Sequence, residues 1–486
     1  MTKRYIVQTM GCQMNVHDSR RIEEVLRASG WQATDEATLA DLVIFNTCSI
    51  REKAEHKLMS ALGTVRPLKD ARKDVVIAVA GCVAQQEGEN LLKKARFVDV
   101  VLGPDNIPEL PALVEHARSG GAPIARTVFD VHAPAFLDAT PDPTRLEVNA
   151  FVTVMKGCDE RCTYCIVPHT RGPERYRSAD EIVREVGSMV DGGVREVTLL
   201  GQTVNSWFEP RGETQSSAEP SSEPPRWAGS VVETSQFAEL LRRIAREVPA
   251  LARLRYTSPH PRHLTDALIE AHAELGVLSD HLHLPVQSGS DRVLKRMLRR
   301  YTRGLYLERI AKLREAVPAL TLSTDVIVGF PGETDEDFEE TLSLVRAAGF
   351  TAAFAFKYSP RPFTPALKLG DDVPEAVKDE RLQRLFAVVG EQQRAHLDGL
   401  VGSRQRVLVE GPSRDGVRFQ GRTHRNEIVH IAGPEGVDLT GQLVDVTVEH
   451  ANNHSLMGLA EGVVPAAPAP RRKRLPVLGG AAGGAA

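Results

Sequence analysis

Residues 157–165 read GCDERCTYC and place Cys158, Cys162 and Cys165 in a C-x3-C-x2-C pattern. Three thiolates leave a tetrahedral zinc site one ligand short, and zinc knuckles usually pair C-x2-C with further cysteines or histidines. An iron–sulfur cluster with four irons, held by three cysteines, instead keeps one iron open for a substrate group. The pattern therefore favours an iron–sulfur cluster, with zinc as the alternative.

This cysteine loop follows the first of six predicted strands in a region that we place at residues 144–375. Helical patterns lie between the strands, as at residues 178–193 and 335–349. Six β/α units predict a partial (β/α)6 barrel, with the active site at the carboxyl ends of the strands. The predicted strands are residues 151–155, 196–200, 253–257, 281–285, 323–330 and 351–359.

A second set of cysteines lies in the first 120 residues. YIVQTMGC, LVIFNTC and VVIAVAGC are β-rich apolar runs that stop at Cys12, Cys48 and Cys82, and helical patterns follow them. Alternating strands and helices predict an N-terminal parallel α/β domain over residues 1–120, and parallel strands bring these cysteines to one edge. Each could be an ordinary buried thiol, but their shared position favours a second cluster with its own open iron.

The C-terminal part has short strands and turns, which predict a small closed β-barrel over residues 400–464, of the oligonucleotide-binding sort. Residues 209–225 are rich in Ser, Pro and Glu, and residues 465–486 form a tail rich in Pro, Gly and Ala. Both segments have little to bury, so they are predicted to be unstructured. We therefore expect an α/β multidomain protein.

Composition limits the class of protein and its compartment. The 486 residues exceed one ordinary core, and the net charge of -4 argues against a uniformly basic nucleic-acid binder. No apolar run reaches the roughly 20 residues that span a bilayer, and the start MTKRYIVQTMGC does not resemble a signal peptide. We therefore expect a cytoplasmic protein without a membrane partner, in which reduced cysteines are metal ligands or catalysts.

Taken together, these motifs resemble the methylthiotransferases of the radical S-adenosylmethionine superfamily, from residue 3 to about residue 464. GCQMNVHDS, NTCSIREKAEHK and GCVAQQ are similar to the tRNA (MiaB) branch. The ribosomal-protein (RimO) branch would more typically read GCPKN and NTCGFI, and the threonylcarbamoyl-adenosine branch GCKVN and NTCTV. Phe363 departs from the family, which usually has Gly there, and residues 209–225 are an insertion.

The resemblance implies two [4Fe-4S] clusters, S-adenosylmethionine, a tRNA substrate, a radical core and a C-terminal TRAM barrel. Cys158, Cys162 and Cys165 would hold the radical cluster, and Cys12, Cys48 and Cys82 the auxiliary cluster. All six would be catalytic. The residues implied to contact the cofactor are Tyr164, Gln202 in LLGQTVNS, Ser288 in HLPVQSGS, and Ile327 and Gly329 in VIVGFPGE.

The activity implied by the resemblance is methylthiolation of isopentenylated adenosine at position 37 of tRNA. A 5′-deoxyadenosyl radical would take hydrogen from C2, and sulfur on the auxiliary cluster, methylated by a second S-adenosylmethionine, would be inserted there. This C–H bond is not acidic enough for general-base chemistry, so a cofactor-borne radical is required. An electron donor and a sulfur source are also implied. The alternatives are methylthiolation of a ribosomal-protein aspartate and a non-enzymatic iron–sulfur sensor.

A basic run at residues 292–303, RVLKRMLRRYTR, contains six cations and no acid. We predict that Arg299 and Arg300 contact RNA phosphate, with a solvated helix face as the alternative. The predicted C-terminal barrel, with six arginines and eight acids over residues 401–464, is not basic. Histidines near strand ends could be metal ligands, although hydrogen-bonded roles are favoured for them: His260, His263, His281 and His283.

Overall fold

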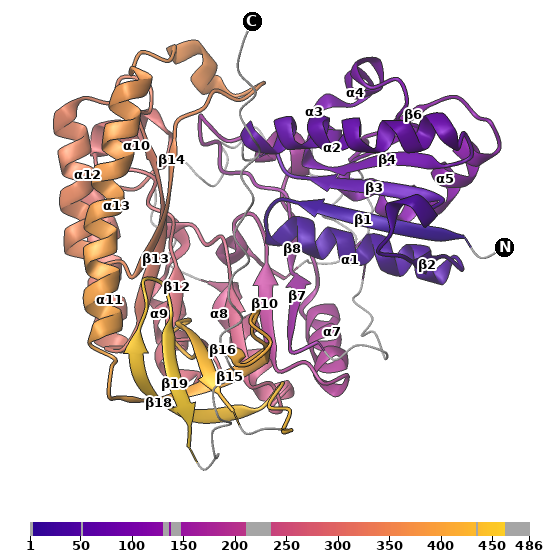
Figure 1. Cartoon of the computed structure of the whole chain (residues 1–486). Coiled ribbons are helices and arrows are strands. Elements are labelled where there is room, and N and C mark those ends of the chain that lie inside the picture. The colour runs from indigo at the N-terminus through magenta and orange to yellow at the C-terminus, as the bar shows by residue number, and fades with distance from the viewer. Residues whose placement is uncertain are drawn as a thin grey trace, which may run out of the picture. The chain divides into compact units, whose positions relative to one another are not determined.

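The computed structural model describes six stretches of the chain, whose elements are labelled in Figure 1. The predicted tail at 465–486 and all but the first residue of segment 209–225 lie outside them. Within the described part, no helix is both long and apolar enough to cross a membrane. The described stretches are residues 3–49, 52–129, 136–137, 147–209, 235–433 and 436–461.

The N-terminal region contains a six-stranded sheet in the order β2-β1-β3-β4-β5-β6, and every pair of neighbours is parallel. Met10 of β1 pairs with Thr47 of β3, which pairs with Gly81 of β4. Three strands that precede cysteines therefore end level with one another. The strands are β1 (Arg4–Met10), β2 (Gln32–Ala33), β3 (Leu42–Thr47), β4 (Val76–Gly81), β5 (Val100–Leu102) and β6 (Ile124–Arg126).

Helices cover both faces of this sheet, as Figure 1 shows. Leu42 and Ile44 of β3 pack in a core with α1 (Gln13–Ala28) and α5 (Leu110–Arg118). Val43 and Phe45 pack in a second core on the other face. This alternation follows from the twofold period of a strand, and a strand buried on both faces is continuously apolar. The helices of the second face are α2 (Glu52–Ala71), α3 (Cys82–Glu87) and α4 (Glu89–Lys94).

The central region contains all six predicted strands, in two parallel sheets of order β11-β10-β7 and β12-β13-β14. The six predicted β/α units are thus confirmed. An isolated parallel bridge also joins Leu254 to Leu278, which lies ahead of β12. The strands are β7 (Asn149–Thr153), β10 (Glu196–Leu200), β11 (Arg253–Tyr256), β12 (His281–His283), β13 (Thr321–Val328) and β14 (Ala352–Lys357).

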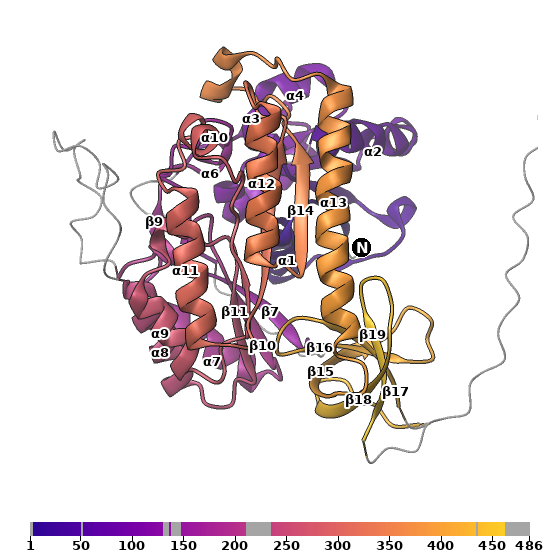
Figure 2. The ribbon, with the colours of Figure 1, turned by 90° about the vertical axis from the view of Figure 1, so that its left-hand side faces the viewer.

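Most of the helices between these strands begin at a residue whose side chain caps the helix. Ser178 forms a capping box with Glu181, and Thr334 forms one with Asp337. A helix that begins this way has two of its free backbone N–H groups satisfied. Figure 2 shows α11 and α12 running side by side. The helices are α7 (Ala179–Asp191), α8 (Gln236–Glu247), α9 (Asp266–Glu274), α10 (Asp291–Arg296), α11 (Arg303–Ala316), α12 (Asp335–Ala348) and α13 (Glu375–Asp398).

The C-terminal unit is a closed five-stranded barrel of order β15-β16-β17-β19-β18, as predicted. Its interior is filled by alternate apolar residues such as Val407, Val429 and Val446. Closure leaves no free sheet edge. The strands are β15 (Arg404–Pro412), β16 (Phe419–Thr423), β17 (Ile428–Ala432), β18 (Leu443–Ala451) and β19 (Leu456–Ala460).

Phe363, the departure from the family pattern, lies in the segment that follows β14. Its φ of 65° is in the left-handed region, where glycine is normally favoured because it has no Cβ. The Phe363 side chain is 63% exposed, and its ring centroid lies 5.6 Å from that of His169. The left-handed turn is therefore present with phenylalanine at this position.

Candidate functional site

The cysteine loop of the central region is enclosed by a short antiparallel pair, β8 (Met155–Lys156) with β9 (Arg175–Tyr176). Gly157 opens the loop with φ 81°, and a Cβ there would lie 1.9 Å from the carbonyl oxygen of Pro173. Only glycine fits this position. The Gly157 N–H donates to Gln202 Oε1 at 2.6 Å. Gln202, predicted to contact the cofactor, thus braces the loop.

Thr163 fixes the middle of the same loop to the segments around it. Its N–H donates to the Met297 carbonyl at 3.0 Å, and its hydroxyl donates to the Arg296 carbonyl at 3.0 Å. The Ala366 N–H donates in turn to the Thr163 carbonyl at 2.8 Å. These bonds hold the backbone between Cys162 and Cys165 against movement, as a preformed ligand set requires.

The three thiols of this loop lie in a largely desolvated environment. Cys158 Sγ is 3.0 Å from Thr203 Oγ1, and Arg299 Nη1 donates to Cys162 Sγ at 3.3 Å. Burial raises the pKa of Cys158 well above its usual range and that of Cys165 to about 12. Buried thiols of this kind stay protonated unless a metal takes the place of the proton. The loop therefore suits metal ligation better than nucleophilic chemistry.

The N-terminal cysteines follow directly from the strand register. Cys12 precedes α1, Cys48 follows β3 and Cys82 begins α3, all at the carboxyl edge of the sheet. The hydrogen bond from Cys48, against the effect of burial, lowers the pKa of Cys12 to about 6, whereas burial raises the pKa of Cys82. The strand register thus brings the three thiols to one edge of the sheet, with Cys12 and Cys48 in hydrogen-bond contact.

A buried amide network supports this second set. Asn15 Oδ1 accepts from the Cys12 N–H at 3.3 Å, and Asn15 Nδ2 donates to Asn46 Oδ1 at 3.1 Å and to the Thr47 carbonyl at 3.1 Å. The network joins the residues that follow β1 to the end of β3. Asn15 and Asn46 were not singled out from the sequence, although each lies within three residues of a cysteine.

Arg171, at the end of α6 (Val167–Arg171), reaches the N-terminal cysteines from the central region. Its Nε donates to Cys82 Sγ at 3.4 Å, and its Nη2 donates to Asp18 Oδ2 at 2.6 Å. Burial acts to lower the pKa of Arg171, but the charge of Asp18 helps to raise it well above its usual value. Its third nitrogen, Nη1, is buried and has no hydrogen-bond partner among the described residues. An unused buried donor beside thiols fits a sulfur-rich anionic group.

Neither cysteine set fits a single metal ion. Among the described residues, the one group of three metal-ligating side chains with ligand atoms within 4.8 Å of one another is Glu160, His260 and His263. The thiols of each triplet therefore lie too far apart to share one zinc. A cubane cluster binds each thiolate on a different iron and accommodates this wider spacing. Three cysteines in each set would leave the fourth iron of such a cluster without a protein thiolate.

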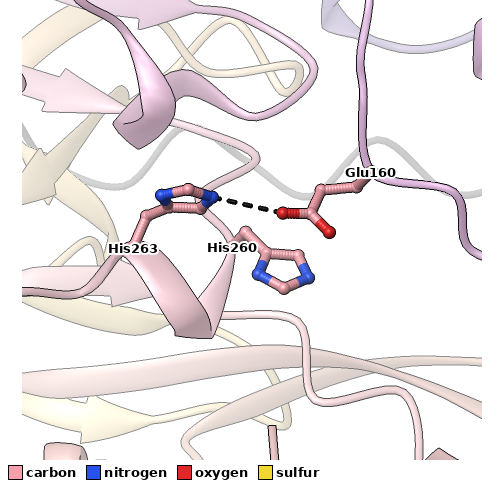
Figure 3. Close-up of side chains that lie close together, drawn as sticks. All are labelled: Glu160, His260 and His263. Carbon is pink, nitrogen blue, oxygen red and sulfur yellow. Dashed lines mark hydrogen bonds and ion pairs between the residues drawn. The ribbon is translucent and has the colours of Figure 1, made fainter. Parts of the chain in front are cut away.

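The Glu160 group itself does not suit a cation (Figure 3). His263 Nε2 lies 3.2 Å from Glu160 Oε1. The Arg262 N–H donates to His260 Nδ1 at 3.2 Å, so Nε2 of His260 carries the hydrogen and offers no lone pair. Arg262 Nη1 also lies 3.7 Å from Glu160 Oε1. A guanidinium already compensates this carboxylate, and His260 is a donor.

The other two histidines considered as ligands are hydrogen-bonded. His281 Nε2 and His283 Nδ1 lie 3.0 Å and 2.9 Å from the hydroxyl of Ser323. Neither belongs to a group of three candidate ligands in the described part of the chain.

Two of the predicted cofactor residues meet in one apolar cluster. Tyr164 and Ile327 pack against Phe330 and Tyr358, and the Tyr164 and Phe330 rings meet edge-on at 6.4 Å. Gly329 follows Ile327 by two residues with φ 68°. An aromatic and aliphatic surface beside the cysteine loop suits the flat face of a purine.

Ser288 is placed differently from this cluster. It is fully buried, its hydroxyl lies 3.3 Å from Thr341 Oγ1, and it accepts from the Ser290 N–H at 3.2 Å. The structure gives this hydroxyl partners within the protein, and its contact with the cofactor stays a prediction.

The expectation for Arg299 is corrected by the structure. Arg299 is only 6% exposed and points at Cys162, so its guanidinium is not available to RNA phosphate. The solvated-helix alternative fits Arg292 and Lys295, which are exposed on α10, but α10 ends at Arg296, so Arg299 and Arg300 lie outside a helix. Arg292 bonds Asp337, and Arg303 bonds the Glu340 carbonyl. Arg300 is partly exposed, and its contact with RNA stays a prediction.

Comparisons with known proteins agree with this arrangement. Residues 4–103 match the model of the uncharacterized protein family UPF0004, residues 152–345 the radical SAM superfamily and residues 399–460 the TRAM domain. A protein of Sorangium cellulosum named tRNA-2-methylthio-N(6)-dimethylallyladenosine synthase is 57% identical over 98% of this chain and 99% of its own. The chain belongs to this synthase family.

Other members of the family are similar over nearly the same length. The synthase of Acidithiobacillus ferrooxidans is 46% identical over 94% of this chain and 97% of its own. Among solved structures, the radical S-adenosylmethionine methyltransferase TsrM from Kitasatospora setae has a TM-score of 0.51 at 14% identity. It covers 75% of this chain and 77% of its own, and this likeness shows the fold alone.

Proposed function

We infer that this protein is a radical S-adenosylmethionine methylthiotransferase that converts N6-dimethylallyladenosine in tRNA to its 2-methylthio derivative. The observation that carries this function is the 57% identity to a synthase of that name over almost the whole of both chains. The modified nucleoside would be position 37, next to the anticodon. With a tRNA substrate, the enzyme would act in the cytoplasm.

Cys158, Cys162 and Cys165 would hold the radical cluster, and Gln202 and Thr163 keep their loop in place. When bound, this cluster and S-adenosylmethionine supply a carbon radical that can take hydrogen from an unactivated C–H bond. Tyr164 and Ile327 provide an apolar surface for the cofactor's adenine.

We propose that Cys12, Cys48 and Cys82 hold a second, auxiliary cluster that carries the sulfur to be inserted. This rests on their convergence at one sheet edge and on the unused donor of Arg171 beside them. Contact between Arg171 of the central region and Cys82 of the N-terminal region brings the two cysteine sets into one neighbourhood. The enzyme would also require an external electron donor and a sulfur source.

The alternatives receive less support. The C-terminal barrel has more acidic than basic residues, which favours a ribosomal-protein substrate over RNA. The similarity of nearly the whole chain to tRNA-2-methylthio-N(6)-dimethylallyladenosine synthases outweighs that observation. A sensor without catalysis would not need the complete radical core over residues 152–345.

Mass spectrometry of tRNA nucleosides from a strain that lacks this gene tests the proposed function. We expect the 2-methylthio-N6-dimethylallyladenosine peak to disappear, its unthiolated precursor to accumulate, and a plasmid copy of the gene to restore the product. An unchanged methylthio peak in the deletion strain would contradict the function.

A further inference from the structure

Each cysteine triplet has one buried arginine that donates to one of its thiols. Arg171 Nε lies 3.4 Å from Cys82 Sγ, and Arg299 Nη1 lies 3.3 Å from Cys162 Sγ. The two arginines are 4% and 6% exposed. They come from different parts of the chain, and each reaches its cysteine across a long stretch of sequence, so local packing does not explain the repetition.

The two guanidinium groups differ in how their charge is compensated. Arg171 forms a buried ion pair with Asp18, in which Nη2 and Oδ2 are 2.6 Å apart. Arg299 instead donates to the Tyr301 hydroxyl at 3.1 Å and the Pro285 carbonyl at 3.3 Å. Its hydrogen-bond partners are therefore uncharged apart from the sulfur of Cys162 once that thiol is ionised.

A buried positive charge at these positions would affect the reduction potential of any neighbouring group that gains an electron. A four-iron cluster with three thiolates is anionic when oxidised and gains a further negative charge on reduction. A buried cation that hydrogen-bonds a ligating sulfur stabilises the reduced form, because net charge and hydrogen bonds to sulfur set the potential of such clusters. The low dielectric of a buried site strengthens the effect.

We propose that Arg171 and Arg299 are positioning residues that set the reduction potentials of the auxiliary and the radical cluster, respectively. This inference rests on the proposed function, since it takes both triplets to bind clusters. Arg171 stabilises the reduced auxiliary cluster and Asp18 moderates that effect, whereas Arg299 acts on the radical cluster. Nη1 of Arg171, which has no hydrogen-bond partner among the described residues, would be a second donor to the same cluster.

The test is a redox titration, followed by electron paramagnetic resonance, of anaerobically reconstituted full-length protein. Each cluster is measured alone, in a background in which the other triplet is replaced by alanine. We expect Arg171→Gln to shift the auxiliary midpoint to more negative potential and to leave the radical midpoint in place. Arg299→Gln should shift the radical midpoint to more negative potential and leave the auxiliary midpoint in place. Arg171→Lys, which keeps the charge, should recover much of the auxiliary shift.

Asp18→Asn separates an electrostatic role of Arg171 from a structural one. An electrostatic role predicts that Asp18→Asn and Arg171→Gln shift the auxiliary midpoint potential in opposite directions, whereas a structural role predicts shifts in the same direction. Removal of the carboxylate should shift the auxiliary midpoint to less negative potential, and the Arg171→Gln, Asp18→Asn double variant should return it toward wild type. A matched control is Arg253→Gln, since Arg253 is equally buried and pairs with Glu196 at 3.0 Å at the start of β11. It should move neither midpoint.

Outcomes separate this inference from the proposed function. Shifts of equal sign for Arg171→Gln and Asp18→Asn, or no shift in either, would overturn the inference while both clusters remained. If Arg171→Gln binds too little iron to titrate, the sign for Asp18→Asn decides. If the protein that keeps only the N-terminal triplet, with Arg171 and Asp18 unchanged, binds no cluster, the proposed function and this inference both fail.

Discussion

Gly157 is the residue on which the geometry of the radical-cluster loop depends most directly. Gly157→Ala would place a Cβ 1.9 Å from the Pro173 carbonyl oxygen at a φ of 81°, and the left-handed conformation alone costs roughly 1–2 kcal/mol. We expect the variant to lose the radical cluster and keep the auxiliary one, so that bound iron falls by about half. Iron analysis and electron paramagnetic resonance measure this.

Gly187→Ala is the matched control, because Gly187 lies inside α7 and a Cβ there meets nothing within 4 Å. This change should leave iron content and activity unchanged. Full iron content in Gly157→Ala would contradict the role given to this glycine.

Phe363 offers a second residue-scale test. A non-glycine residue at φ 65° is strained by about 1 kcal/mol or more, and replacement by glycine relieves this strain. Glycine also gives the unfolded chain more conformational entropy, which offsets roughly 0.5–1 kcal/mol of the stability gained. Phe363→Gly should therefore leave the free energy of unfolding in urea within about 1 kcal/mol of wild type and retain activity. A loss of several kcal/mol would show that the contact with His169 stabilises this turn.

Spacing identified the cysteines but not the residues that surround them. Three ligands within eight positions form a local pattern, and three strand ends in a parallel sheet converge by topology. Arg171 lies 89 positions from Cys82, and Arg299 lies 137 positions from Cys162. No periodicity encodes such contacts, so charge alone assigns the basic run at 292–303, Arg299 included, to RNA and not to a thiol.

At the scale of elements, α9 packs on β11 through a buried pair that makes stability depend on pH. The Tyr256 hydroxyl lies 2.7 Å from His272 Nε2, and burial lowers the pKa of His272 to about 4. The unfolded chain binds a proton near pH 6.5 and the folded protein does not until about pH 4. Stability contributed by neutral His272 is therefore lost as pH falls between these values, by up to about 3 kcal/mol.

His272→Gln removes this titration and keeps a polar partner for Tyr256. Urea unfolding at pH 7 and pH 5 should show a smaller loss of stability on acidification for the variant than for wild type. Equal losses in the two proteins would contradict a depressed pKa for His272.

Elements with caps and a clear period were predictable, whereas short irregular ones were not. The helices at 179–191 and 335–348 begin at Ser178 and Thr334, whose caps are visible in the sequence. The run at 292–303 lacks such a signal at its end. Leu298 and Arg300 take positive φ there, which a pattern of charges does not reveal.

At the scale of the whole molecule, three kinds of sequence pattern correspond to three folded regions. The parallel sheet presents one cysteine triplet, the radical core presents the other, and the C-terminal barrel presents none. Contact of Arg171 with both Asp18 and Cys82 links the first two regions. The proposed function requires each triplet to bind its own cluster and to perform its own step.

Alanine replacement of one triplet at a time tests this division most directly, with bound iron, 5′-deoxyadenosine and methylthio-adenosine measured together. Without Cys158, Cys162 and Cys165, the account predicts neither 5′-deoxyadenosine nor methylthio product. Without Cys12, Cys48 and Cys82, it predicts loss of about half the iron, some remaining 5′-deoxyadenosine and no methylthio product. Full iron content or methylthio-adenosine from the N-terminal triple variant would contradict the second cluster.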